Sequence, residues 1–516
     1  MRMNENDKWI RIVSPSINLP SLKDNTADVD RLIKGLKKGL QTESVNIGFA
    51  QVRQIPSFLK EHKYNIKAVL YREKGVWNLI DVVSSEKRSV YGISIDLGTS
   101  TIVLRLVDLI SGSPVEEVSF LNPQTEIGTD ILTRIHYANE SGGLEYLQKI
   151  LLDKINSVIA CLADNHQVDT MQIAGLAVAG NTTMTHLFLG LDPSGICREP
   201  YIPSVNSPGI IKSSELGIDI NPESPVYVFP SVGSYFGGDL IAGVLASGMT
   251  ERTEVSMLVD VGTNAEVVVG NSEWLMACAG AAGPALEGGV AKMGMMAGPG
   301  AIDKIVIDKV TKEFHIRTIG DQLPAGICGS GMIDLAAQLF INSMIDMRGK
   351  FIPQNCGDRL IDIDGINHFT VVSGRDSANE KDLTLSQPDI DSLLRSKAAM
   401  YTILRTITRM VNLTMNDIQQ FNIAGTFGSY IDPGSAITLG MIPDLPLDTY
   451  KPLGNTSLEG ANKVLLSAAA RNDASRIRDC ITYVELNVNQ EFMNDFSAAK
   501  FIPHTDRSLF PSVKSA

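Results

Sequence analysis

The spacing of apolar positions predicts a small module at the start of the chain. Apolar residues recur at helical spacing over residues 26–40, which predicts a helix. A second helix is expected near residues 55–62, followed by strand-like runs at 66–72 and 76–83. These elements suffice for a small α+β module, and the basic stretch 84–89 is expected to be a linker.

The pattern changes at Tyr91, where apolar strand-like runs begin to alternate with helical stretches and glycine-rich turns. This alternation is typical of an α/β body. Long helical patterns cover residues 388–416 and 456–470. Residues 276–301 are rich in Gly and Ala but are flanked by strand-like runs. We therefore interpret them as a segment whose backbone closely approaches a ligand or other backbone, and not as a linker.

Composition narrows the class of protein. The 516 residues carry a net charge of −13, which does not favour a nucleic-acid or anionic-membrane surface for the whole chain. The charge is uneven, because residues 1–90 hold 16 Lys and Arg against 10 Asp and Glu. No apolar run reaches the ~18 residues of a membrane span, and the start has no apolar signal core. Scattered cysteines without CxxC spacing fit a reducing compartment, so a cytoplasmic protein is expected.

Two segments, 95–101 and 259–265, share one pattern: an apolar strand, Asp, an apolar residue, Gly, Thr, a small polar residue and a second strand. The two aspartates lie 164 residues apart, which suggests a duplicated α/β unit with its copies facing one another. The positions concerned are Asp96, Gly98, Thr99, Ser100 and Thr101 in the first copy, and Asp260, Gly262, Thr263 and Asn264 in the second.

These residue types are suited to binding the phosphate groups of a nucleoside triphosphate. A glycine turn between two strands can direct successive backbone N–H groups at phosphate oxygens, and the hydroxyl groups add donors. An aspartate at each strand end can hold Mg²⁺, usually through water, or orient an attacking water. Two ordinary hairpins with Asp-x-Gly turns are the alternative, but two copies with the same offsets argue against it. The glycine-rich segments lack the lysine of a P-loop.

The two hairpins resemble the phosphate motifs of the superfamily of acetate and sugar kinases, heat-shock chaperone ATPases and actin. The run 422–428, with Gly425, Thr426, Phe427 and Gly428, resembles the adenosine motif of that superfamily. Residues 176–190 and the start of 456–470 resemble its two connecting motifs. The resemblance covers about residues 90–516 and implies two actin-like (ribonuclease H-like) ATPase halves around a nucleotide cleft, preceded by the small α+β module.

Within that superfamily the strings AVAGNTTMTHLFLG, FGGDLIAG, VDVGTNAEVVVG, AAGPALEGG, GICGSGMIDL and IAGTFG are similar to the reductive activators of corrinoid enzymes. The resemblance implies a linker segment with a helix at 1–40, a small middle domain at 41–89 and the ATPase domain at 90–516. It implies ATP and Mg²⁺ as ligands and ATP-dependent reduction of a Co(II) corrinoid protein to Co(I) for methyl transfer. A corrinoid protein is the expected partner, and a homodimer is compatible with the family.

Members of that family carry a 2Fe–2S domain at the N-terminus or iron–sulfur cysteines at the C-terminus, and this sequence encodes neither set. Either the sequence is part of a longer chain, or electrons come from an external donor such as a ferredoxin.

Several single residues carry alternative interpretations. Asn181 stands where related ATPases often place an acidic, water-orienting residue, and an amide there predicts slow hydrolysis, but it is equally a helix N-cap. Asp239 is predicted to cap the following helix, with a ligand role as the minor alternative. Gly329 and Ser330 are expected in a loop that opens a helix and suits an anion or a ribose hydroxyl. His186 is expected to be a satisfied core residue rather than a cobalt ligand.

Two other functions remain open from the sequence. A small-molecule kinase of the same fold would phosphorylate a sugar or a carboxylic acid, and a non-catalytic actin-like scaffold would need polymer or peptide contacts. The predicted catalytic set is Asp96, Asp260 and Asn181, with both aspartates as metal ligands.

Overall fold

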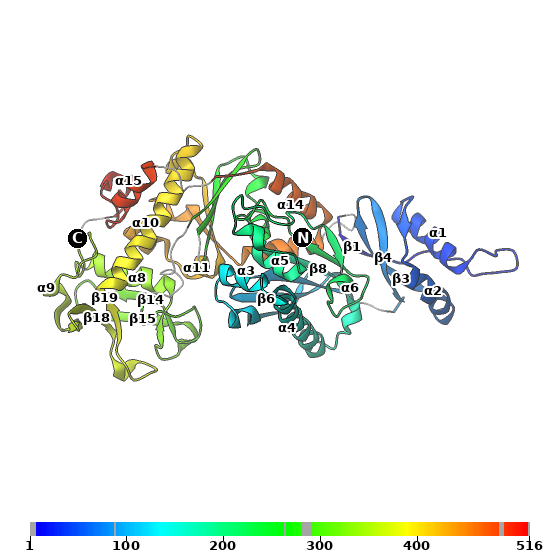
Figure 1. Cartoon of the computed structure of the whole chain (residues 1–516), viewed down its shortest axis with the longest axis horizontal. Helices are drawn as coiled ribbons and strands as arrows, with labels where there is room; N and C mark the ends of the chain where they lie inside the picture. Colours follow the sequence, from blue (N-terminus) through cyan, green and yellow to red (C-terminus); the bar gives the residue numbers. More distant parts are fainter. Residues whose placement is uncertain (1–6, 87–88, 263–264, 281–290, 485–489, 514–516) are drawn as a thin grey trace. The chain divides into compact units, whose positions relative to one another are not determined.

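The computed structural model describes residues 7–86, 89–262, 265–280, 291–484 and 490–513 (Figure 1). The chain forms two compact units. Residues 1–246 and 457–479 form unit 1, and residues 247–456 and 480–516 form unit 2. No helix in the described ranges has the length and the hydrophobicity needed to cross a bilayer.

The N-terminal module of unit 1 is a four-stranded sheet covered by two helices. The sheet order is β1 (Ile10–Val13), β3 (Ile66–Glu73), β4 (Val76–Ser84) and β2 (Val45–Asn46), and the helices are α1 (Asp28–Leu40) and α2 (Phe49–Glu61). Leu32 and Leu36 of α1 and Ile55 and Leu59 of α2 are buried in one core with the strands. The predicted helices and strands of this module are confirmed, although α2 begins six residues before the predicted start. Elements on both sides of residue 40 share this sheet and core, and the predicted domain division at residue 40 stays a prediction.

The body of unit 1 is a six-stranded mixed sheet. Its order is β7 (Pro114–Leu121), β6 (Thr101–Asp108), β5 (Tyr91–Leu97), β8 (Ile173–Gly180), β10 (Pro225–Val228) and β9 (Ile210–Lys212). β5, β6 and β7 form an antiparallel meander, and β8 runs parallel to β5. The helices of this unit are α3 (Ile131–Ala138), α4 (Gly143–Asn165), α5 (Thr182–Leu189), α6 (Ser213–Leu216), α7 (Gly238–Ser247), α13 (Thr456–Leu466) and α14 (Ala468–Cys480).

Unit 2 repeats this topology. Its large sheet has the order β21 (Tyr450–Gly454), β20 (Gln420–Ala424), β11 (Ser256–Val261), β12 (Ala265–Gly270), β13 (Leu275–Gly280) and β22 (Ile481–Tyr483). β11, β12 and β13 form the antiparallel meander, and β20 runs parallel to β11. The five strands from β13 to β21 therefore repeat the order and directions of those from β7 to β10. The predicted duplication is confirmed at the level of the sheet.

Two three-stranded sheets complete unit 2: β14 (Ala301–Ile307), β15 (Phe314–Thr318) and β16 (Gly326–Ile327), and β17 (Leu360–Ile363), β18 (Ile366–Val372) and β19 (Leu383–Ser386). Its helices are α8 (Gly329–Ile341), α9 (Pro353–Cys356), α10 (Gln387–Met410), α11 (Gly425–Tyr430), α12 (Pro433–Leu439) and α15 (Gln490–Ala499). The long α10 packs against β12 and β13. It also packs against α15 (Figure 1).

Two predicted helices end earlier than expected. The pattern over 388–416 continues to residue 416, but α10 ends at Met410 because Asn412 adopts a left-handed φ of 57°. The pattern over 456–470 is divided between α13 and α14. Ser467 separates the two helices, and its hydroxyl accepts from the N–H of Ala470 at 3.0 Å, which caps the second helix.

Candidate functional site

The first repeated hairpin connects β5 to β6 in unit 1. Asp96 is the penultimate residue of β5, in register with Val103 on β6 and Ala179 on the parallel strand β8. Gly98 follows at the turn, where a Cβ atom would lie 2.2 Å from the carbonyl oxygen of Thr101. Glycine is therefore required by the turn itself. Thr99 and Thr101 are partly buried and Ser100 is exposed.

Three successive carbonyl groups of this turn accept hydrogen bonds from other parts of unit 1. The carbonyl of Gly98 accepts from Asn122 Nδ2 at 3.0 Å, that of Thr99 from Arg134 Nη2 at 2.7 Å, and that of Ser100 from the Asn122 N–H at 2.8 Å. In a trans peptide the N–H points opposite to the C=O. The N–H groups of residues 99–101 are thus directed away from Asn122 and Arg134.

Arg134, which no local sequence pattern indicates, is fully buried. Besides Thr99 it donates from Nε to the carbonyl of Gly128 at 2.8 Å. Burial lowers the pKa of Arg134 to about 10. A buried guanidinium that binds carbonyl groups holds the turn in one conformation, so Arg134 is a positioning residue for the hairpin.

Asn181 lies beside this hairpin. It is the N-cap of α5, where its Oδ1 accepts from the N–H of Met184 at 2.9 Å. Its Nδ2 donates to Thr99 Oγ1 at 2.9 Å. The N-cap interpretation of Asn181 is therefore confirmed, and its amide also contacts the predicted phosphate-binding turn, while a water-orienting role stays a prediction.

The carboxylate of Asp239 lies near Asn181. A Cβ atom on Gly237 would lie 2.5 Å from Asn181 Cα and 2.6 Å from Asp239 Oδ1. The prediction that Asp239 caps its helix is wrong, because α7 already begins at Gly238 and Asp239 is its second residue. The carboxylate accepts from the N–H of Leu240 at 2.9 Å. A ligand role for Asp239 stays a prediction.

The second hairpin connects β11 to β12 in unit 2. Asp260 is again the penultimate residue of its strand, in register with Glu266 on β12 and Ala424 on the parallel strand β20. Gly262 follows it, partly buried. Thr263 and Asn264 lie outside the described residues, so their predicted roles stay predictions.

Asp260 lies against the motif that resembles an adenosine site. Gly425, which follows β20 and begins α11, has a φ of 77°, and a Cβ atom there would lie 3.0 Å from Asp260 Oδ1. Gly428 on α11 is tight against the carbonyl of Ile423, at 2.4 Å from a Cβ position. Thr426 and Phe427 belong to α11, but their side chains lie outside the described part of the structure. Two motifs far apart in sequence thus meet at one strand end.

Gly329 and Ser330 lie in the first turn of α8, not in a loop as expected. Ser330 is only 4% exposed, and its hydroxyl lies 3.2 Å from Cys328 Sγ. The neighbouring Gly331 would bring a Cβ atom to 2.2 Å from the carbonyl of Ile302. Close packing of α8 on β14 therefore accounts for a glycine in this segment. The predicted ligand roles of Gly329 and Ser330 stay predictions.

His186 is fully buried, with Nδ1 at 2.7 Å from the carbonyl of Thr182 and Nε2 at 3.3 Å from the N–H of Val205. Burial lowers its pKa. It is a satisfied core residue, as predicted.

Asp96 and Asp260 are the residues predicted to hold Mg²⁺. Among the described residues no group of three or more His, Cys, Asp or Glu side chains could hold a metal ion. Mg²⁺ is commonly bound by one or two carboxylates together with phosphate oxygens and water. The predicted roles of Asp96 and Asp260 as Mg²⁺ ligands stay predictions.

Three family models match consecutive parts of the chain. They are described as the RACo linker region, over residues 5–89, the RACo middle region, over 91–252, and the C-terminal domain of RACo, the ASKHA domain, over 254–514.

Named relatives are similar over most of the chain. "Corrinoid activation enzyme RamQ" of Eubacterium limosum is 31% identical over 433 residues, covering 81% of this chain and 72% of that protein. "[Co(II) methylated amine-specific corrinoid protein] reductase" of Methanosarcina barkeri is 24% identical over 439 residues, covering 79% and 76%. The solved structure titled "Reductive activator for corrinoid,iron-sulfur protein" matches with a TM-score of 0.90 and 37% identity, covering 99% of this chain and 82% of that one.

Proposed function

Because the chain belongs to the RACo family, whose linker, middle and C-terminal regions it matches in order, we propose that it is an ATP-dependent reductive activase of a corrinoid protein. In the proposed reaction an external donor supplies one electron, and the Co(II) of the partner's corrinoid becomes Co(I), the state needed for methyl transfer. The observation that carries the proposal is the twin Asp-Gly hairpin on two sheets of one topology, in a chain similar to a reductive activator at a TM-score of 0.90.

The first hairpin is proposed to bind phosphate groups of ATP through the N–H groups of residues 99–101. Their orientation is supported by the carbonyl contacts to Asn122 and Arg134. The hydroxyl groups of Thr99, Ser100 and Thr101 would add donors. In unit 2, Gly262, Thr263 and Asn264 would do the same, and Gly425 to Gly428 would lie against the adenosine.

Asp96 and Asp260 would hold Mg²⁺ through water. When bound, Mg²⁺ neutralises phosphate charge and polarises the phosphoryl oxygens. The backbone at Gly425 leaves room for the Asp260 carboxylate, because a side chain there would contact its Oδ1.

Asn181 is proposed to orient a water molecule without deprotonating it. Its Oδ1 accepts from Met184 and its Nδ2 donates to Thr99, and an amide has no useful basicity. Hydrolysis is therefore expected to be slow until the partner binds. Coupling requires that ATP and the corrinoid protein each bind one conformation better than another, since a ligand shifts an equilibrium only by its differential affinity.

The electron donor is proposed to be a separate protein of the ferredoxin class.

A cytoplasmic location fits the six unpaired cysteines. A homodimer stays a prediction from the family. The alternative of a small-molecule kinase is less well supported, because the names of the three relatives above all concern a corrinoid.

The proposal is tested by mixing the full chain with a Co(II) corrinoid protein, MgATP and a reduced ferredoxin, and following the visible spectrum. We expect conversion to the Co(I) spectrum that depends on both ATP and this chain. ADP in place of ATP is the matched control. No ATP-dependent conversion, with several corrinoid proteins and the donor in excess, would overturn the proposal.

A further inference from the structure

The start of α7 lies against the start of α5 in unit 1. A Cβ atom on Gly237 would lie 2.5 Å from Asn181 Cα, 3.0 Å from Thr182 N and 2.6 Å from Asp239 Oδ1. These three atoms therefore surround one point, and a side chain on residue 237 would displace at least one of them. Because residue 237 is a glycine, the Asp239 carboxylate lies beside the N-cap residue of α5.

Two further contacts fix the position of this segment. A Cβ atom on Gly238, the first residue of α7, would lie 2.6 Å from the Cβ atom of Phe229, which follows β10. In the loop before α7, the carbonyl of Gly233 accepts from Thr182 Oγ1 at 3.1 Å. The segment is thus held against the end of β10 and the start of α5, so the carboxylate of Asp239 is presented at a preformed position.

Asn181 connects this carboxylate to the proposed phosphate-binding turn. The amide Nδ2 of Asn181 donates to Thr99 Oγ1 at 2.9 Å. An amide can orient a water molecule through hydrogen bonds but is not a useful base, whereas a carboxylate is. Asp239 is partly exposed, so water can reach it. The carboxylate beside the amide therefore supplies the basicity that the amide lacks.

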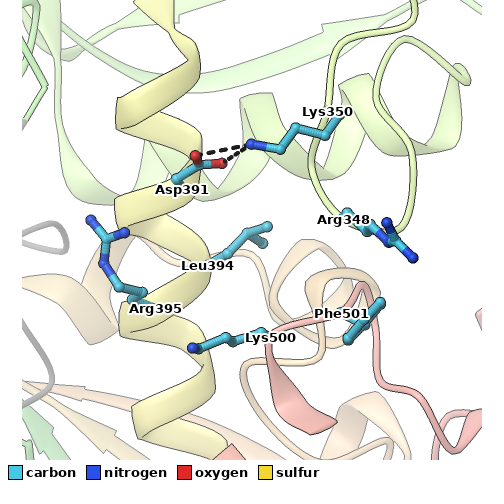
Figure 2. A pocket seen from close by; sticks show the side chains of 7 residues that line it. All are labelled: Arg348, Lys350, Asp391, Leu394, Arg395, Lys500 and Phe501. Atoms are coloured by element: carbon cyan, nitrogen blue, oxygen red, sulfur yellow. Dashed lines mark hydrogen bonds and ion pairs between the residues drawn. The ribbon is translucent and has the colours of Figure 1, made fainter. Parts of the chain in front are cut away.

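The charged groups around a pocket of about 330 Å³ in unit 2 do not meet at one point in this way (Figure 2). The guanidinium groups of Arg348 and Arg395, which line this pocket, point away from each other. The ammonium of Lys500 lies 4.9 Å from the ring centre of Phe496. The convergence of groups at Gly237 is therefore the stronger indication of a reaction site.

We propose that Asp239 accepts the proton of the water that attacks the γ-phosphate of ATP, while Asn181 orients this water. The inference rests on the proposed ATP-binding role of the hairpins. In the step, the water oxygen bonds to the γ-phosphorus, the bond from that phosphorus to the bridging oxygen breaks, and ADP leaves with the electron pair. The water proton passes to the Asp239 carboxylate and then to solvent, and the products are ADP and inorganic phosphate.

The contact of Asp239 with its own helix fits slow hydrolysis. Asp239 Oδ1 accepts from the N–H of Leu240 at 2.9 Å. This N–H competes with the proton of a water molecule for the same oxygen. Hydrolysis without a partner is therefore expected to be slow even though a carboxylate is at hand.

The test is single-turnover hydrolysis of radiolabelled ATP by an excess of the full chain. Asp239→Asn keeps the size of the side chain and an acceptor for the Leu240 N–H, so folding should be retained. We expect the rate constant to fall about 10²-fold, while the dissociation constant of MgATP changes less than about twofold. Asp219→Asn, which changes an exposed aspartate of unit 1, is the matched control and should hydrolyse ATP like the parent.

A second variant separates a proton acceptor from a residue with a structural role. Asp239→Ala removes the carboxylate and leaves room for a small one. We expect formate to raise the rate constant of this variant at least about tenfold, because formate can accept the proton instead. The rate constant of the parent should not respond to formate.

Four results would overturn the inference. The first is an unchanged rate constant in Asp239→Asn, and the second is a lower rate constant with equally weaker MgATP binding. The third is a loss that a higher Mg²⁺ concentration restores, since Asp239 would then hold the metal ion. The fourth is the absence of rescue by formate, which would assign Asp239 a structural role. A parent chain that binds no MgATP would overturn the proposed function as well.

Discussion

Asn181 Nδ2 donates to Thr99 Oγ1 across 2.9 Å and so joins the first turn of α5 to the turn of the β5–β6 hairpin. The two residues are separated by 82 positions in the sequence. This hydrogen bond ties an uncharged amide to the proposed phosphate-binding turn.

The first prediction concerns this amide. Asn181→Asp should raise ATP hydrolysis in the absence of a partner by about 10²-fold, the lower end of general-base contributions, because a carboxylate can accept the proton of the attacking water. Aspartate is an equally good N-cap, so the thermal midpoint should change little. Steady-state phosphate release measures the rate. Asn181→Ala, which should cost about 1 kcal/mol of stability without raising the rate, is the control. An unchanged rate in Asn181→Asp would remove Asn181 from the mechanism.

A second prediction concerns Gly425, whose φ is 77° and whose added Cβ would lie 3.0 Å from Asp260 Oδ1. Gly425→Ala should cost about 1–2 kcal/mol through backbone strain and also weaken MgATP binding by displacing the carboxylate. Gly365→Ala is the matched control, because its φ is 80° and an added Cβ would meet nothing within 4 Å. Calorimetric titration should show weaker ATP binding only for the first variant. Equal loss in both would mean that strain alone is responsible.

The third prediction is a pH dependence. Burial raises the pKa of Asp334 to about 6 from 3.8, and the residue is 4% exposed. Within the described structure its Oδ1 has no hydrogen-bond partner. Because the native state holds this proton more tightly than the unfolded state, the stability that it contributes is complete below pH 3.8 and is lost as the pH rises through 6.

Asp334→Asn should therefore stabilise the protein at pH 7.5 by about 1–2 kcal/mol, and the gain should shrink as the pH falls toward 4. Thermal unfolding at both pH values measures it. Asp303→Asn should destabilise at pH 7.5, because Asp303 is paired with Arg317 at 2.5 Å. A gain for Asp334→Asn that does not change with pH would contradict this account of the buried carboxyl.

The fourth prediction concerns the attachment of the N-terminal module within unit 1. Asp7 accepts from Ser467 Oγ at 2.6 Å and from the N–H of Ala469 at 2.9 Å, at the start of α14. Nearby, the guanidinium of Arg471 lies 4.7 Å from the ring centre of Trp9. Asp7→Ala should weaken the free energy of this attachment by about 1.4 kcal/mol. Limited proteolysis at residues 84–90 should then become about tenfold faster. Asp7→Asn should show a smaller effect, since it keeps one acceptor, and identical digestion of all three proteins would contradict the role given to Asp7.

Local patterns were sufficient to predict the duplicated sheet and the hairpins. Asp96, Gly98 and their counterparts Asp260 and Gly262 belong to short contiguous runs whose alternation and turn chemistry can be read directly. The N-terminal module was predictable for the same reason.

Long-range support was not predictable. Arg134 and Asn122 lie 35 and 24 residues from the turn atoms that they bind, and a single polar residue on another element leaves no local pattern. The glycine-rich run at 329–331 resembled a ligand loop. Gly331 instead permits close packing against Ile302, which depends on tertiary neighbours.

The central claim is that the strand-end aspartates Asp96 and Asp260 are each needed for MgATP binding, and equilibrium binding of MgATP to Asp96→Ala and Asp260→Ala tests it most directly. Each variant should bind at least about tenfold more weakly than the parent and hydrolyse ATP correspondingly more slowly. Asp219→Ala, which removes an exposed aspartate of unit 1, should bind like the parent. If both strand-end variants bind and cleave ATP as well as the parent, the nucleotide site lies elsewhere and the account is wrong.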